Sequence, residues 1–106
     1  MGEIKQIDIH KAKEFIDQGE CTIVDIRDAD TYQEAHIKGA VPINDANVEE
    51  FLKTAVKTKP LICYCYHGIS RQGAAEFFKH NGFQEAYSIQ GGFEAWKGVY
   101  PFVSGS

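Results

Sequence analysis

The stretch that decides the fold covers residues 60–71 and reads Pro60-Leu61-Ile62-Cys63-Tyr64-Cys65-Tyr66-His67-Gly68-Ile69-Ser70-Arg71. Its first half is a nearly continuous apolar run, which is typical of a strand covered on both faces in a parallel sheet. Its second half leads into residues 71–80, which we predict to form a helix that ends at Asn81-Gly82.

Strand-like and helix-like segments alternate along the whole chain. We predict strands near residues 4–9, 21–26, 40–43, 60–65 and 86–89, and helices at 11–18, 30–35, 48–55, 71–80 and 93–97. Asp8 or His10 is expected near the start of the first helix, Gly19 at its end, and Asp45 or Asn47 at the N-cap of the third. Such alternation implies right-handed βαβ units, so we predict an α/β fold with a parallel sheet between helix layers.

Length and composition restrict the function. A chain of 106 residues has the size of one small domain, which we place at residues 1–103, with a short disordered tail at 104–106. The formal net charge of −4 argues against a nucleic-acid partner, because phosphate binding needs a basic surface. No apolar run approaches the roughly 20 residues of a membrane span, and the N-terminus lacks the apolar stretch of a signal peptide. The odd number of cysteines, three, is a poor disulfide framework, so we expect a reducing compartment, the cytoplasm.

Cys65 stands where α/β proteins place their chemistry. It ends the apolar strand and precedes a helix, and ligand sites of open α/β sheets lie at the carboxyl ends of strands. A short loop that closes onto a helix N-terminus can direct several backbone N–H groups inward and bind an anion, and Gly68 lets the loop adopt a positive φ. The same environment lowers the pKa of a thiol below about 8.5. The pattern therefore favours a nucleophilic Cys65 that attacks an anionic substrate; the alternative is that Cys65 is only a buried apolar residue.

The other chemistry-bearing residues have simpler interpretations. Cys63 and Cys21 are predicted to be core residues, and neighbours at i and i+2 on a strand suit disulfide geometry badly. A metal site built from Cys63, Cys65 and His67 lacks a fourth ligand and zinc-ribbon spacing, so no metal is expected. Asp25, Arg27 and His36 are predicted to form a buried or half-buried polar network that braces the fold, and Phe93, Trp96 and Tyr100 to be core or rim aromatics.

Three segments resemble the rhodanese (sulfurtransferase) family. They are Asp25-Ile26-Arg27-Asp28 with Tyr32 and His36-Ile37-Lys38-Gly39-Ala40, the six-residue loop Cys65-Tyr66-His67-Gly68-Ile69-Ser70, and Gly91-Gly92-Phe93-Glu94-Ala95-Trp96. The loop is especially similar to that of single-domain thiosulfate sulfurtransferases of the GlpE type. The segments occur in the family's order and cover nearly the whole chain.

The resemblance implies a rhodanese-like three-layer domain whose central parallel sheet has about five strands. It also implies a ping-pong reaction in which Cys65 takes the outer sulfur of thiosulfate, releases sulfite and passes the sulfur from its persulfide to cyanide or to a thiol acceptor, without a cofactor. Backbone N–H groups of Tyr66, His67, Gly68, Ile69 and Ser70 would hold the negative charge. A reduced dithiol such as thioredoxin is a chemically suitable acceptor, and we expect a monomer or a weak homodimer.

One departure from the family leaves other functions open. Many rhodaneses carry a basic residue at the second or sixth loop position, where this chain has Tyr66 and Ser70. Arg71 could supply the positive charge, or it is a solvated residue of the following helix. Cys65 to Arg71 also spells the C-x5-R loop of cysteine-dependent phosphatases and arsenate reductases, in which an arginine clamps a tetrahedral anion. The remaining alternative is a non-catalytic rhodanese-like binding module.

Overall fold

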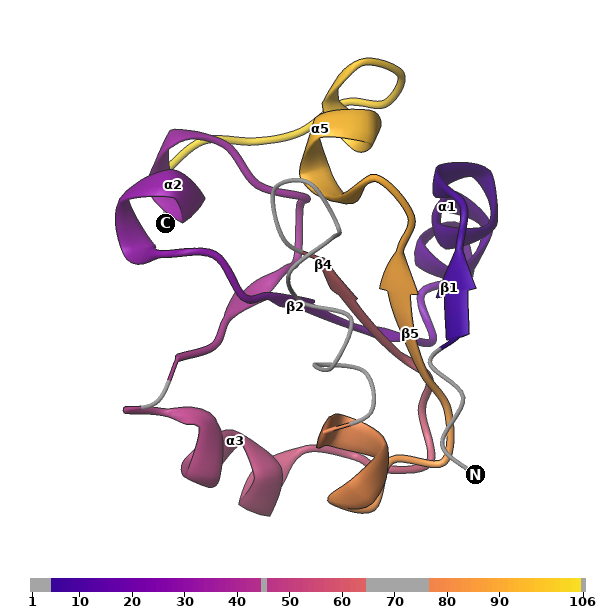
Figure 1. Cartoon of the computed structure of the whole chain (residues 1–106), viewed down its shortest axis with the longest axis vertical. Coiled ribbons are helices and arrows are strands. Elements are labelled where there is room, and N and C mark those ends of the chain that lie inside the picture. The colour runs from indigo at the N-terminus through magenta and orange to yellow at the C-terminus, as the bar shows by residue number, and fades with distance from the viewer. Residues whose placement is uncertain (1–4, 45, 65–76, 106) are drawn as a thin grey trace.

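The computed structural model describes residues 5–44, 46–64 and 77–105, and within them five strands form one parallel sheet (Figure 1). The strands are β1 (Lys5–Ile7), β2 (Thr22–Asp25), β3 (Val41–Pro42), β4 (Leu61–Tyr64) and β5 (Ala86–Ile89). They pair in the order β1-β5-β4-β2-β3, and every pair is parallel. The predicted α/β class and the parallel sheet of about five strands are confirmed.

The register aligns the carboxyl ends of the central strands. Asp25, the last residue of β2, lies opposite Tyr64, the last residue of β4. Asp25 also pairs with Pro42 at the end of β3. The segments that follow β2, β3 and β4 therefore leave the sheet at the same end.

Helices cover both faces of the sheet (Figure 1). α1 (Ile9–Gln18) and α5 (Gly92–Lys97) lie on one face, α3 (Val48–Thr54) and the helical residues 77–80 lie on the other, and α2 (Ala29–Glu34) lies beside the end of β2. Of the predicted helix at 71–80, only residues 77–80 are among those described. No helix in the described part of the chain has the length and apolar character needed to cross a membrane.

Local capping explains where the helices begin and end. The Asp8 carboxylate accepts a hydrogen bond from the Lys11 backbone N–H at 2.8 Å, so α1 starts at Ile9, two residues earlier than predicted. Gly19 ends α1 with φ 73°, as predicted for a C-cap. Asn47 stands at the N-cap of α3 but makes no capping bond; its amide donates to the Pro42 carbonyl at 2.8 Å instead. Asp45, the other candidate, lies outside the described residues.

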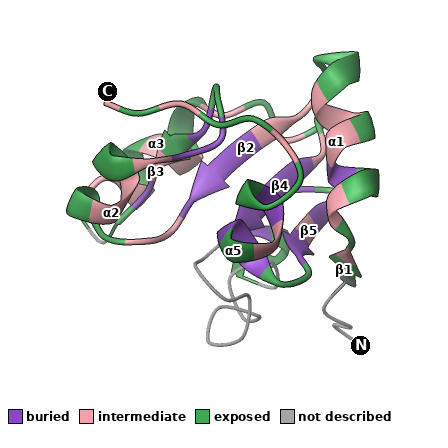
Figure 2. Ribbon diagram, turned by 90° about the horizontal axis from the view of Figure 1, so that it is seen from above, coloured by how far each residue is buried: buried purple, intermediate pink, exposed green. Residues whose placement is uncertain are grey.

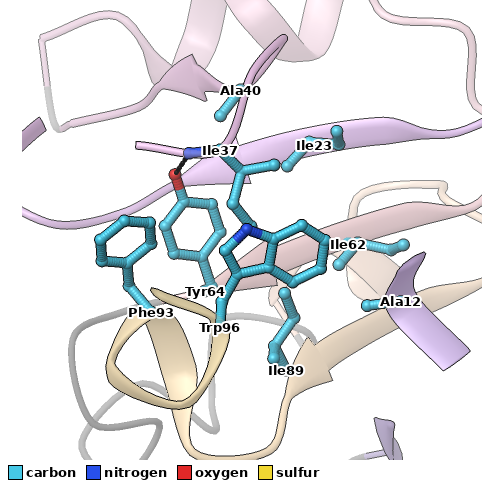
Figure 3. Packing of buried hydrophobic residues seen from close by; sticks show 9 residues of the cluster. All are labelled: Ala12, Ile23, Ile37, Ala40, Ile62, Tyr64, Ile89, Phe93 and Trp96. Carbon is cyan, nitrogen blue, oxygen red and sulfur yellow. Dashed lines mark hydrogen bonds between the residues drawn. The ribbon is translucent and has the colours of Figure 1, made fainter. Parts of the chain in front are cut away.

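The core consists of one apolar cluster on each face of the sheet. Side chains of β4 alternate between them: Ile62 and Tyr64 belong to the cluster under α1 and α5 (Figure 3), and Leu61 and Cys63 to the cluster under α3. All four are buried, and β2, β4 and β5 are mostly buried along their length (Figure 2), as the apolar run predicted for β4. Cys63 is therefore a core residue.

The segment after α5 runs back toward α2. The Trp96 indole donates to the Pro101 carbonyl at 3.0 Å, His36 and Val103 form an antiparallel bridge, and the Gly105 N–H donates to the Gln33 carbonyl at 2.8 Å. The bonds of Val103 and Gly105 connect the C-terminal segment to His36 and Gln33, on the two sides of Ala35. The domain boundary at 103 stays a prediction.

Two valine-to-alanine substitutions test whether Val24 of β2 belongs to the core. Val24→Ala should lower the free energy of unfolding by about 2 kcal/mol, because it removes two methyl groups from a fully buried side chain and leaves a cavity. Val56→Ala should change it by less than about 0.5 kcal/mol, because Val56 is 54% exposed. Urea unfolding followed by circular dichroism measures both, and equal effects would contradict the assignment of Val24 to the core.

Candidate active site

A buried ion pair lies at the carboxyl end of β2. The Arg27 Nη2 donates to Oδ2 of Asp25 at 2.6 Å, and its Nε donates to both carboxylate oxygens at 3.1 Å. The exposed fractions of the two side chains are 4% for Arg27 and 0% for Asp25. Such two-point contacts between a guanidinium and a carboxylate fix geometry as well as charge.

Further hydrogen bonds satisfy the same two side chains. Asp25 Oδ1 also accepts from the Arg27 backbone N–H at 2.9 Å, and Arg27 Nη2 donates to the Ala35 carbonyl at 2.5 Å. Burial by itself would lower the pKa of Arg27, but the Asp25 carboxylate more than offsets this, and the pKa is raised. The Arg27 guanidinium therefore stays charged, and its hydrogen bonds join β2 to the segment after α2.

His36 shares this neighbourhood but not these bonds. It is buried, as predicted, and its Nδ1 donates to the Tyr32 carbonyl at 2.8 Å. The two rings stack with their centroids 3.8 Å apart. The predicted polar network is thus confirmed for Asp25 and Arg27, whereas His36 braces α2 through Tyr32.

Two aromatic rings enclose the guanidinium. Arg27 Cζ lies 4.4 Å from the ring centroid of Phe93 in α5 and 5.3 Å from that of Tyr64 in β4. The two rings lie 5.8 Å apart at 28° to each other. A cation at these distances is attracted to the faces of the rings. Phe93 is buried, as its predicted place in the core or rim requires, and its contact with Arg27 is an addition that the sequence pattern does not predict.

Tyr64 is held at its hydroxyl as well as at its ring. The hydroxyl accepts a hydrogen bond from the Ile37 N–H at 3.1 Å (Figure 3). Burial raises the pKa of Tyr64 strongly, and the neighbouring Asp25 carboxylate raises it further, so the phenol stays protonated. Tyr64, which directly precedes Cys65, therefore has a neutral, buried side chain that contacts three other segments.

Two glycines at the start of α5 place Phe93 against Arg27. Gly91 has φ 79° and Gly92 has φ 62°, which favour glycine at both places. A Cβ on Gly91 would also lie 2.8 Å from the Cβ of Ala95. The tight turn from β5 into α5 thus requires Gly91, and it directs Phe93 toward Arg27.

The predicted nucleophile and its loop lie outside the described residues. These are Cys65, Tyr66, His67, Gly68, Ile69, Ser70 and Arg71. β4 ends at Tyr64, so the chain enters the loop beside the buried ion pair. The described residues nearest this point are the Asp25–Arg27 pair and Tyr64, and the assignment of the chemistry to Cys65 stays a prediction.

The other two cysteines, Cys63 and Cys21, lie in buried or partly buried environments that do not suit a nucleophile. Cys63 is fully buried, and its Sγ lies 3.4 Å from the Tyr87 carbonyl. Cys21 is partly buried, and burial raises its pKa above the ordinary value. Neither side chain is in an environment that favours a thiolate.

Comparisons with known proteins agree with this architecture. A family model described as rhodanese-like domain matches residues 8–98. The chain is 43% identical over 97 residues to the thiosulfate sulfurtransferase GlpE of Coxiella burnetii, covering 92% of this chain and 91% of that one. It is 41% identical over 96 residues to the GlpE of Pseudoalteromonas translucida, covering 91% of each. A crystal structure of a thiosulfate sulfurtransferase from Pseudomonas aeruginosa shares the fold, with a TM-score of 0.86 at 16% identity over 97% of this chain and 20% of that one.

Asp25→Asn tests the energetic role of the buried pair. The substitution leaves the Arg27 charge buried without its counter-charge, so the free energy of unfolding should fall by about 3 kcal/mol or more. Asp17→Asn is the matched control, because Asp17 pairs with Lys13 at 2.8 Å on the exposed face of α1 and should contribute about 0.5 kcal/mol or less. Urea unfolding at neutral pH measures both, and a small effect at Asp25 would contradict a tightly paired, desolvated carboxylate.

Proposed function

This chain belongs to the rhodanese family, and on that premise we propose that it is a thiosulfate sulfurtransferase whose Cys65 carries the transferred sulfur. The observation that carries the activity is the identity of 41–43% to proteins named thiosulfate sulfurtransferase over more than nine-tenths of both chains. The chain is thus an enzyme of the rhodanese type. Cys65 is assigned as nucleophile from its sequence position directly after a central strand.

The reaction has two displacement steps at sulfur. The Cys65 thiolate attacks the outer sulfur of thiosulfate, a new S–S bond forms on the cysteine, and the S–S bond of thiosulfate breaks as sulfite leaves with the electron pair. Cyanide or a thiolate then attacks the outer sulfur of the persulfide, and the Cys65 thiolate leaves. This covalent intermediate divides one transfer into two easier steps. The loop residues 66–70 would stabilise the charge through backbone N–H groups.

The buried ion pair makes this end of the sheet suitable for an anionic donor. A carboxylate at Asp25 without its partner would repel thiosulfate, and the formal net charge of −4 would add to that repulsion. Arg27 neutralises the carboxylate at 2.6 Å. The positive field that the reaction needs can therefore be local, supplied by loop amides, the helix that follows and Arg71.

The acceptor and the setting follow from the chemistry of a persulfide. A protein persulfide passes its sulfur readily to a second thiolate, so we propose a reduced dithiol such as thioredoxin as the acceptor in the cell and the cytoplasm as the location. A monomer or a weak homodimer is proposed as the working form. Because Cys21 and Cys63 are poor thiolates, neither would intercept the sulfur from Cys65.

Cys65→Ser should abolish sulfur transfer. Wild-type protein incubated with thiosulfate should gain one sulfur atom by intact mass, and the sulfur should map to Cys65 in peptide mass analysis. Cyanide should then remove it as thiocyanate. Cys63→Ser and Cys21→Ser should retain most of the activity. If the wild-type protein gains no sulfur, forms no thiocyanate and instead hydrolyses an aryl phosphate, it is a phosphatase; if it does none of these, it is a binding module.

Arg71→Ala should raise the KM for thiosulfate by about tenfold with a smaller effect on kcat, because the loss of one charged hydrogen bond to an anion costs about 1.5 kcal/mol. Lys79→Ala, which removes an exposed cation further along the predicted helix, is the control and should leave KM unchanged. Steady-state thiocyanate assays measure both constants. An unchanged KM in the Arg71 variant would mean that this charge does not bind the donor.

A further inference from the structure

Arg27 is the point at which four separate segments of the chain meet. It bonds to Asp25 at the end of β2 and to the Ala35 carbonyl after α2. Its guanidinium faces the ring of Phe93 in α5 and the ring of Tyr64 in β4. These contacts use both the hydrogen-bond donors and the positive charge of the side chain, so its position is fixed from several directions.

Tyr64 is held in place by contacts with these same segments. Its carbonyl accepts from the Ile26 N–H at 3.1 Å, its hydroxyl accepts from the Ile37 N–H at 3.1 Å, and its ring stacks against Phe93. Only 1% of Tyr64 is exposed. The backbone that continues from Tyr64 into Cys65 therefore starts from a residue that is held at both ends of its side chain and at its carbonyl.

Stability alone does not account for a buried ion pair at this position. Well-packed apolar residues of similar volume often stabilise a fold as much as a buried pair does, because both charges must be desolvated. What the pair adds is directional geometry, since a guanidinium has to lie in the plane of its carboxylate partner. Directional geometry matters most where a reacting atom must be aimed.

We propose that Arg27 is a positioning residue for sulfur transfer, which fixes the direction of the chain at Tyr64 and thereby aims the sulfur of Cys65 at the donor. The inference rests on the proposed function and adds a second residue to it. Displacement of a reacting group by about 1 Å can cost roughly a hundredfold in rate. Arg27 acts through Tyr64 and Phe93 and need not touch the substrate.

Arg27→Lys is the first test variant. Lysine keeps the charge but loses the planar fork of donors that serves Asp25 and Ala35 together. The second variant, Asp25→Leu with Arg27→Met, removes both charges and leaves neither one buried alone, so it is expected to fold even if the lysine variant does not. The control, Lys13→Met with Asp17→Leu, removes an exposed pair in the same way.

The decisive readout separates positioning from stability. Each variant is first shown to be folded at the assay temperature by its urea unfolding curve. Single-turnover sulfite release from thiosulfate should then be slower by about a hundredfold in the folded Arg27 variants and unchanged in the control. A folded Arg27 variant with the wild-type rate would overturn the proposal, because a purely structural residue affects only the unfolding curve.

A second readout does not depend on thiosulfate. Iodoacetamide labelling at pH 7, resolved by peptide mass, compares Cys65 with Cys21 in the same molecule. A thiol displaced from its anion-binding loop returns toward an ordinary pKa of about 8.5, so Cys65 should react about tenfold more slowly in the Arg27 variants while Cys21 is unchanged. An unaltered Cys65 rate would overturn the positioning role. Failure of wild-type protein to take up sulfur would instead overturn the proposed function.

Discussion

The carboxylate of Asp25 ends a central strand in a place that solvent does not reach, and this constraint shapes everything around it. A buried charge is tolerated only with a partner and with its lone pairs satisfied. Arg27 supplies the partner, and its remaining contacts then fix the segment after α2, the start of α5 and the end of β4. The buried pair thus brings four segments of the chain together beside the apolar cluster under α1 and α5.

The arrangement reconciles an acidic protein with an anionic substrate. The carboxylate nearest the end of β4 is neutralised in place, and the phenol of Tyr64 stays uncharged because burial raises its pKa. The Asp25–Arg27 pair and Tyr64 therefore add no net charge at the end of β4. We predict that selectivity for the donor resides in residues 65–71, whose backbone N–H groups would act over short distances.

Much of the fold could be predicted from local patterns, whereas contacts between distant segments could not. The apolar run of β4, the C-cap at Gly19 and the break at Gly91-Gly92 each express a local physical preference. Asp8, one of the two candidates for the start of the first helix, is its N-cap, and β1 therefore ends at Ile7, before the Ile9 that the isoleucine pattern included. Asn47 and His36 were assigned by residue type, but each bonds to a backbone carbonyl nearby. The contact of Arg27 with Phe93 depends on strand order, which no single segment encodes. The role of residues 65–71 as the catalytic loop stays a prediction.

The strand order has a consequence for synthesis on the ribosome. β1 is the first strand to emerge, yet in the described sheet its partner is β5, the last. The pairing of β2 with β4 becomes available once residues 61–64 have emerged, so a partial sheet can form while β1 waits. At roughly 5–20 residues per second, the interval between β1 and β5 lasts several seconds. During that time Ile7, which in the folded protein packs against the core under α1 and α5, lacks the β5 strand beside it. β1 thus stays unpaired until residues 86–89 have emerged, a period in which contacts with chaperones or with neighbouring chains compete with folding.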